Sequence, residues 1–109
     1  MTEYIQVLTT TEAKDDAERI ARSLTEQRLA GCVQVIGPIS STYWWKGKLE
    51  SAQEWVCLVK TEKRLYGELE QAIKDVHPYE TPEIMAVPVE AGSADYMAWL
   101  SGELKPSQE

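Results

Sequence analysis

The sequence contains one histidine, His77, whose side chain could bind a metal ion. A neutral imidazole suits Cu(II) or Zn(II), but one such ligand alone makes a weak site. Further donors would have to come from carboxylates or from other copies of the chain. Alternatively, His77 ends a helix, because a proline follows it and the C-terminal end of a helix dipole favours an imidazole. The residues slightly favour this second interpretation.

The two cysteines, Cys32 and Cys57, could act as soft ligands for Cu(I). Each lies in an apolar, strand-like run, and neither has a second cysteine two to four residues away. The paired-cysteine pattern of zinc sites is therefore absent. Isolated cysteines in apolar strands are usually small buried hydrophobic residues. We therefore expect both thiols to be reduced and buried.

A third group of polar residues could line a binding cleft. A carboxylate, an ammonium and a phenol can together orient a small ligand or a metal ion. The same groups could equally form hydrogen bonds and ion pairs between subunits. The residues are Glu54, Lys60, Tyr79 and Glu83. The sequence has no glycine-rich phosphate loop, no nucleophile paired with a histidine motif and no metalloprotease helix, so we predict that the protein is not an enzyme.

The composition is that of one small acidic globular domain, predicted over residues 1–109. The formal net charge is −7 and the isoelectric point is about 4.7. Such a surface repels phosphate backbones, so nucleic acid is excluded as a partner. No segment approaches 18 consecutive apolar residues, and the first residues do not follow the signal-peptide pattern. We therefore expect a cytoplasmic protein without a membrane association.

The first half of the sequence predicts a strand, a helix and a long hairpin. Residues 4–8 are typical of a strand, threonines 9–11 could cap the following helix, and Gly31 is placed to end it. Two strand-like runs then flank a tight turn at Lys46-Gly47. The first, residues 32–45, is interrupted by Gly37-Pro38, which indicates a bulge or bend. The second, residues 48–60, is apolar on both faces, which predicts a central strand covered on both sides.

The second half predicts a helix, a strand and a short final helix. Thr61 could cap a helix whose apolar stripe runs from Leu65 to Val76 and which ends at His77-Pro78. A strand over residues 83–87 follows, and Ser93 could cap the last helix. Residues 105–109 are predicted to be a disordered tail. The order β-α-β-β-α-β predicts an α+β, ferredoxin-like sandwich with a long hairpin and an added C-terminal helix.

The predicted hairpin is too long for the domain that carries it. Strands of about 14 residues span roughly 45 Å, whereas a compact domain with this number of residues has a radius of gyration of about 13 Å. The distal end should project, exposing an aromatic surface that pairing with other subunits would bury. The predicted interface residues are Tyr43, Trp44, Trp45 and Trp55. Alternatively, the bulge folds the hairpin back over its own sheet, and these aromatic residues belong to the core.

Five segments, in order along almost the whole chain, resemble the CutA family of divalent-cation tolerance proteins. They are residues 30–33, 41–48, 54–61, 77–83 and 96–100. The resemblance implies a ferredoxin-like fold, a homotrimer and a link to tolerance of divalent metals, and some members bind copper. It also favours a pocket shared between subunits for the polar residues described above.

The sequence departs from the pattern of metal-binding CutA members at two positions. Those members often have a cysteine at the end of the first strand and two histidines before Pro-Tyr. Here Thr9 or Thr10 occupies the cysteine position and Val76 replaces the first histidine, so only His77 remains. Two hypotheses follow. The chain is a trimeric metal-responsive protein that binds Cu(2+) or another divalent cation weakly, or it is a trimeric PII-like signalling or scaffold protein that binds a small molecule or a protein at intersubunit clefts.

Overall fold

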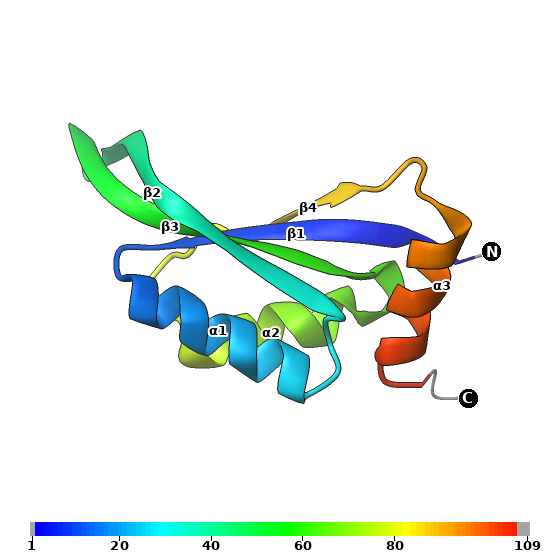
Figure 1. Ribbon diagram of the computed structural model, residues 1–109. Coiled ribbons are helices and arrows are strands. Elements are labelled where there is room, and N and C mark those ends of the chain that lie inside the picture. The colour runs from blue at the N-terminus through cyan, green and yellow to red at the C-terminus, as the bar shows by residue number, and fades with distance from the viewer. Residues whose placement is uncertain (1, 107–109) are drawn as a thin grey trace.

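Four antiparallel strands form one sheet in the computed structural model, which describes residues 2–106 (Figure 1). The elements are β1 (Tyr4–Thr11), α1 (Lys14–Glu26), β2 (Cys32–Trp45), β3 (Lys48–Glu62), the 3-10 turn η1 (Lys63–Leu65), α2 (Tyr66–Val76), β4 (Met85–Pro88) and α3 (Ala94–Glu103). The strand order is β2-β3-β1-β4. This arrangement confirms the predicted ferredoxin-like α+β fold with an added C-terminal helix. Within the described residues, no helix is long and apolar enough to cross a membrane.

The hydrophobic core lies between the sheet and the pair of helices α1 and α2, which cover one face of it (Figure 1). Alternate residues of β1 and β3 point toward these helices, as the period of two in a strand requires. The helices contribute one apolar stripe each. The buried residues include Ile5, Val7, Cys57 and Val59 from the strands and Ala17, Ile20, Leu24, Leu69, Ala72 and Ile73 from the helices. The helical spacing in the sequence predicted both stripes.

The opposite face of the sheet, which we call the open face, has no layer of helices along its length (Figure 1). Leu8, Val56 and Leu58 are only half-buried there. Ile36, Met85 and Val87 are exposed. Strand β3 is central, as predicted, but only one of its faces is covered within a single chain. An apolar sheet face of this kind normally packs against another layer.

Strands β2 and β3 form the predicted long hairpin, which projects beyond α1 and α2 (Figure 1). Their pairing continues to Trp45 and Lys48, and the chain extends 45 × 26 × 22 Å along its principal axes. Lys46 and Gly47, with φ of 50° and 79°, form the turn and supply the two positive φ values of a tight hairpin. The register shifts between Ile36 and Ile39, which confirms the bulge at Gly37-Pro38.

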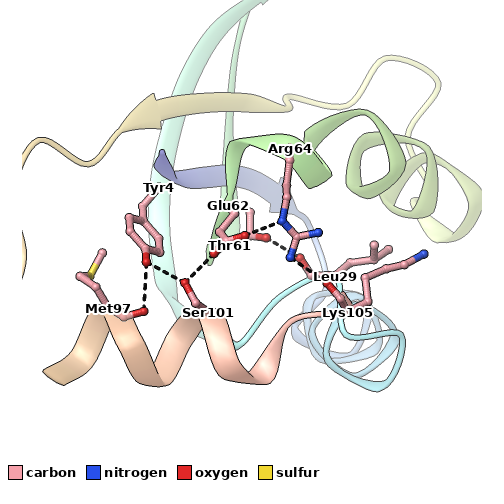
Figure 2. Close-up of polar contacts among 8 residues, drawn as sticks. All are labelled: Tyr4, Leu29, Thr61, Glu62, Arg64, Met97, Ser101 and Lys105. Carbon is pink, nitrogen blue, oxygen red and sulfur yellow. Dashed lines mark hydrogen bonds and ion pairs between the residues drawn. The ribbon is translucent and has the colours of Figure 1, made fainter. Parts of the chain in front are cut away.

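Helix α3 is tied to the far end of the sheet by a polar network (Figure 2). The Tyr4 hydroxyl lies 2.6 Å from Ser101 Oγ, and Ser101 donates a 2.5 Å hydrogen bond to Glu62 Oε2. Arg64 pairs with the other oxygen of Glu62, and its guanidinium also donates to the Lys105 carbonyl at 2.7 Å. These bonds join β1, β3 and α3, although the residues are far apart in the sequence.

Three predicted helix boundaries were wrong. Strand β1 continues to Thr11, and the N-cap of α1 is Ala13, so the threonines do not cap the helix. Helix α1 ends before Arg28, which takes the left-handed conformation (φ 57°) expected of Gly31. Gly31 instead allows α3 to pack closely, because a Cβ there would lie 2.5 Å from Leu100 Cδ1 and the leucine side chain would have to shift. Thr61 lies within β3, and its hydroxyl donates to the Leu29 carbonyl at 2.7 Å.

The remaining boundaries of the C-terminal half are closer to expectation. Ser93 caps α3 as predicted, since its side chain accepts a hydrogen bond from the Tyr96 amide. Strand β4 begins at Met85, slightly later than predicted. The predicted disordered tail falls partly outside the described residues, which end at 106. Lys105, its first residue, donates from its amide to Arg28 and from its ammonium to Glu68.

Candidate functional site

A cleft of about 620 Å³ opens where the projecting hairpin, the end of β1 and the segment before β4 meet. Its aromatic lining comes from Tyr43, Trp44, Trp45 and Tyr79. Its acidic lining comes from Glu12, Glu54, Glu80 and Glu83, and no lysine or arginine of the described residues lines it. Clefts of this size hold small ligands, and the uniform sign of the charge favours cations over anions.

The structure brings together three of the four residues predicted to form a polar site. Glu54, Tyr79 and Glu83 line the cleft. Lys60 does not, because it lies farther along β3, opposite Cys32, with its ammonium 6.0 Å from the centre of the Tyr96 ring. Glu12 was missed in the sequence. It directly follows β1, whose last residue pairs with Trp55, so the strand register places it near Glu54.

Glu54 is the most enclosed carboxylate of the cleft, with 7% of its surface exposed. The Tyr79 hydroxyl donates a 2.7 Å hydrogen bond to Glu54 Oε2. Burial, together with this hydrogen bond, raises the pKa of Tyr79 above its ordinary value, so the phenol stays protonated and remains a donor. Within residues 2–106 no second hydrogen bond or ion pair to Glu54 is formed. One oxygen of this buried carboxylate is therefore available to a cation.

His77 is buried beside the cleft, and both of its ring nitrogens are engaged. Nε2 lies 2.8 Å from the Thr10 carbonyl, and Nδ1 lies 3.1 Å from the Tyr79 amide nitrogen. A carbonyl only accepts and an amide N–H only donates, so the ring is neutral with its proton on Nε2. Burial lowers the pKa of His77, although Thr10 and the charges of Asp16 and Glu54 oppose this effect. His77 is the C-cap of α2, as the second interpretation proposed.

This arrangement does not fit a copper site built on histidine and cysteine. Neither nitrogen of His77 has a lone pair free for a metal ion. The part of the chain that the structure describes has no group of three or more His, Cys, Asp or Glu side chains placed to hold one. Cys57 is buried, and burial raises the pKa of its thiol to about 11. Cys32 lies at the opposite end of β2 from the cleft.

The two threonines at the cysteine position of metal-binding CutA members have different environments. Thr9 is fully buried on the core face, and its hydroxyl has no hydrogen-bond partner within the described residues. Thr10 lines the cleft and offers its carbonyl to His77. A hydroxyl is a poor substitute for a thiolate toward soft metals. The donors that remain in the cleft are oxygen atoms.

The four aromatic residues predicted to form an interface divide into two groups. Trp44 has 73% of its surface exposed, and Tyr43 and Trp45 are also exposed on the projecting hairpin. Trp55 instead packs against the hydrophobic core and against Gly37, and the Lys14 ammonium lies 5.3 Å from its ring centre. Trp55 therefore packs with the core of its own chain, although the hairpin does not fold back over the sheet, and the other three aromatic residues remain available to a partner.

Comparisons with known proteins agree with this fold over nearly the whole chain. The divalent-cation tolerance protein CutA of Archaeoglobus fulgidus is 41% identical over 91 residues, which are 84% of this chain and 88% of the relative. The crystal structure of CutA1 from Oryza sativa superposes with a TM-score of 0.93 at 33% identity, covering 96% of both chains. The structure of the periplasmic divalent cation tolerance protein CutA from Archaeoglobus fulgidus superposes with a TM-score of 0.88 at 37% identity, covering 96% of this chain and 100% of that one. Residues 5–103 match the family of the CutA1 divalent ion tolerance protein, and the chain belongs to that family.

Proposed function

We propose that this chain is a non-enzymatic, homotrimeric divalent-cation tolerance protein of the cytoplasm that binds divalent ions weakly in the acidic cleft. One observation carries the proposal: every charged side chain that lines the cleft is a carboxylate, and the most buried of them, Glu54, has one oxygen without a protein partner in the described residues. A carboxylate withdrawn from water gains more from a nearby cation than an exposed one does.

The available donors favour ions that accept oxygen ligands. Carboxylates, carbonyls and water suit Mn²⁺, Mg²⁺ and Ca²⁺, whereas imidazole and thiolate suit copper and zinc. Glu54 would contact the ion directly, and Glu12 and Glu83 would act through water, because no three such side chains converge among the described residues. Cu²⁺ would bind here only through oxygen and therefore weakly.

The homotrimer is supported by two apolar surfaces that a single chain leaves open. One is the open face of the sheet, with Ile36, Met85 and Val87 exposed. The other is the hairpin, with Trp44 and Trp45. Large apolar side chains left exposed on an open sheet face and on a projecting hairpin favour an interface there. We expect a trimer by light scattering at micromolar concentration and a shift toward monomer in Trp45→Ala. A monomeric wild-type protein would contradict the assembly.

Calorimetric titration with Mn²⁺ and Cu²⁺ tests the cation site. We expect micromolar to millimolar binding that is lost in Glu54→Gln, which keeps the shape of the side chain and removes its charge. Glu26→Gln is the matched control, because Glu26 is an exposed residue of α1 and does not line the cleft. Binding that survives Glu54→Gln would place the ion elsewhere. Cell fractionation tests the location: we expect the protein in the cytoplasmic fraction, and recovery from the periplasm, where the Archaeoglobus fulgidus relative is placed, would contradict this part of the proposal.

A second candidate function is PII-like binding of a small molecule or a protein in the same cleft. The volume of about 620 Å³ and the walls formed by Tyr43, Trp44 and Trp45 favour it, because small-molecule sites are concave and rich in aromatic residues. The carboxylates oppose anionic nucleotides. Thermal shift against metals, nucleotides and amines separates the two functions. Stabilisation by an organic compound and by no metal would favour this second candidate.

A further inference from the structure

We propose that His77 is a positioning residue of the cleft and not a metal ligand: its imidazole holds Tyr79 in place, and Tyr79 in turn orients the carboxylate of Glu54. The inference rests on the proposed function, because it names which group of the cation site binds and which group supports it. It departs from the metal role that the resemblance to copper-binding members implies for His77.

The geometry is a continuous chain of hydrogen bonds from β1 to β3. The Thr10 carbonyl accepts from His77 Nε2 at 2.8 Å, and His77 Nδ1 accepts from the Tyr79 amide, with 3.1 Å between the nitrogens. The Tyr79 hydroxyl then donates to Glu54 at 2.7 Å. The rings of His77 and Tyr79 also pack together, with their centres 4.8 Å apart. Each group is fixed by the one before it.

The segment 78–83 depends on this chain of contacts for its position. It has no regular secondary structure between α2 and β4. Among the described residues, its hydrogen bonds to the rest of the protein are the two made by Tyr79, one to His77 and one to Glu54. The same segment carries Glu80 and Glu83, which line the cleft. Thr81 and Tyr79 line it as well, so loss of the imidazole would displace four side chains of the cleft at once.

A metal ion could bind His77 only by breaking this support. Coordination at Nδ1 would displace the Tyr79 amide. Coordination at Nε2 would require loss of the Nε2 proton and with it the hydrogen bond to the Thr10 carbonyl. In either case the hydrogen bond that orients Tyr79 toward Glu54 would be weakened. The ring lies under the cleft as a supporting group, with 9% of the residue exposed.

A metal-free experiment tests the positioning role directly. In metal-free protein, hydrogen exchange followed by NMR measures the protection of the Tyr79 amide, which donates to His77 Nδ1. His77→Asn offers a side-chain oxygen that can still accept from the Tyr79 amide and should largely keep this protection. His77→Phe removes both ring bonds, and the Tyr79 amide should then exchange faster. An unchanged exchange rate of the Tyr79 amide in a folded His77→Phe protein would overturn the proposal.

Should His77→Phe fail to fold, the wild-type imidazole supplies the second test. Its ¹⁵N signals should report the neutral Nε2–H form and keep that pattern when Zn²⁺ is added, while the signals of Glu54 and Tyr79 move. Zn²⁺ is the demanding probe, because it prefers imidazole wherever one is free. A large shift of either His77 nitrogen on binding would overturn the inference.

The two proposals fail in different ways. Absence of any heat or any shift with Zn²⁺, Mn²⁺ and Cu²⁺ would contradict the proposed function alone. The positioning role would then be decided by the exchange rate of the Tyr79 amide and by the metal-free ¹⁵N pattern of His77. A His77 ring that exchanges between tautomers, or that is protonated on both nitrogens, at pH 7 would contradict the hydrogen bonds on which the role depends.

Discussion

Strand β3 carries two buried glutamates with opposite surroundings. Glu62, 5% exposed, lies near its C-terminal end under α3, paired with Arg64 and bonded to Ser101 at 2.5 Å (Figure 2). Glu54, 7% exposed, faces the cleft and accepts one hydrogen bond, from a neutral phenol. Both lie on the face of the strand that points away from α1 and α2. The chain thus buries one carboxylate with a cation and the other without one.

The difference separates a structural charge from a charge available for binding. A buried carboxylate is costly unless opposite charge and hydrogen bonds compensate it. At Glu62 the protein supplies that compensation, and the site is closed. At Glu54 it supplies only part, and the cleft gives solvent and ions access to the rest. Variants that remove the cation or a hydrogen-bond donor beside one of these carboxylates, or that neutralise the carboxylate itself, test this comparison.

The largest effect on stability is expected from removing the cation beside Glu62. Arg64→Leu leaves the Glu62 carboxylate buried with no ion-pair partner, and it should lower the free energy of unfolding by about 3 kcal/mol. Denaturant titration measures the loss. Arg22→Leu, which breaks an exposed pair with Glu26, is the control and should change stability by less than about 0.5 kcal/mol. Equal effects of the two variants would mean that burial of Glu62 carries no cost.

Neutralising each carboxylate should give unequal losses of stability. Glu62→Gln replaces a charge-assisted pair with weaker bonds and should cost about 2 kcal/mol. Glu54→Gln removes a charge without a cation partner and should change stability by less than about 0.5 kcal/mol while abolishing ion binding. Thermal and denaturant unfolding of both proteins decide the point. A strongly destabilised Glu54→Gln would assign Glu54 to the structural class as well.

Removing one hydroxyl donor from each carboxylate should give smaller losses of stability, and the loss should again be larger at Glu62 than at Glu54. Ser101→Ala deletes the bond to Glu62 beneath α3 and should cost about 1.5 kcal/mol. Tyr79→Phe deletes the bond to Glu54, but water in the cleft can replace it, so the cost should be about 0.5 kcal/mol. Parallel denaturation curves measure both. The reverse order would show that the cleft excludes water as completely as the closed end does.

Local patterns in the sequence were sufficient for the architecture. The apolar stripe from Leu65 to Val76 and the turn at Lys46-Gly47 depend on neighbours within a few residues, and both were predicted correctly. The role of Gly31 was missed because its packing partner, Leu100, lies at the other end of the chain. The closed network around Glu62 was missed for the same reason, since Ser101 belongs to the last helix.

The cleft was predictable only in part. Glu54, Tyr79 and Glu83 were identified by residue type. Lys60 is also a charged residue of β3, as Glu54 is, and only its position along the strand places it outside the cleft. The protonation state of His77 could not be predicted, because it depends on the Thr10 carbonyl and the Tyr79 amide, and every residue has such a carbonyl and every residue except proline such an amide. Backbone partners leave no mark in the sequence.

The smallest expected effect is that of pH on stability, and it should be confined to the cleft around Glu54. Because burial lowers the pKa of His77 in the folded protein below 6.5, the unfolded chain binds its proton first as pH falls. The stabilising contribution of the neutral ring is therefore complete above about pH 6.5 and is lost progressively below it, down to the lowered pKa. The Thr10 carbonyl and the charges of Asp16 and Glu54 oppose the shift, so we expect this loss of stability to be the smallest of these effects.

Hydrogen exchange at pH 7 and pH 5.5 can locate this loss. Amides of residues 77–83 should lose protection at the lower pH, because a protonated Nδ1 can no longer accept from the Tyr79 amide. Amides of α3 should be unaffected, since the network there contains no histidine. In His77→Asn the pH dependence of segment 77–83 should disappear, because an amide does not titrate in this range. Equal loss of amide protection in residues 77–83 and in α3 would mean that the acid sensitivity arises from the carboxylates. The surroundings of Glu54 and Glu62 would then not differ as proposed.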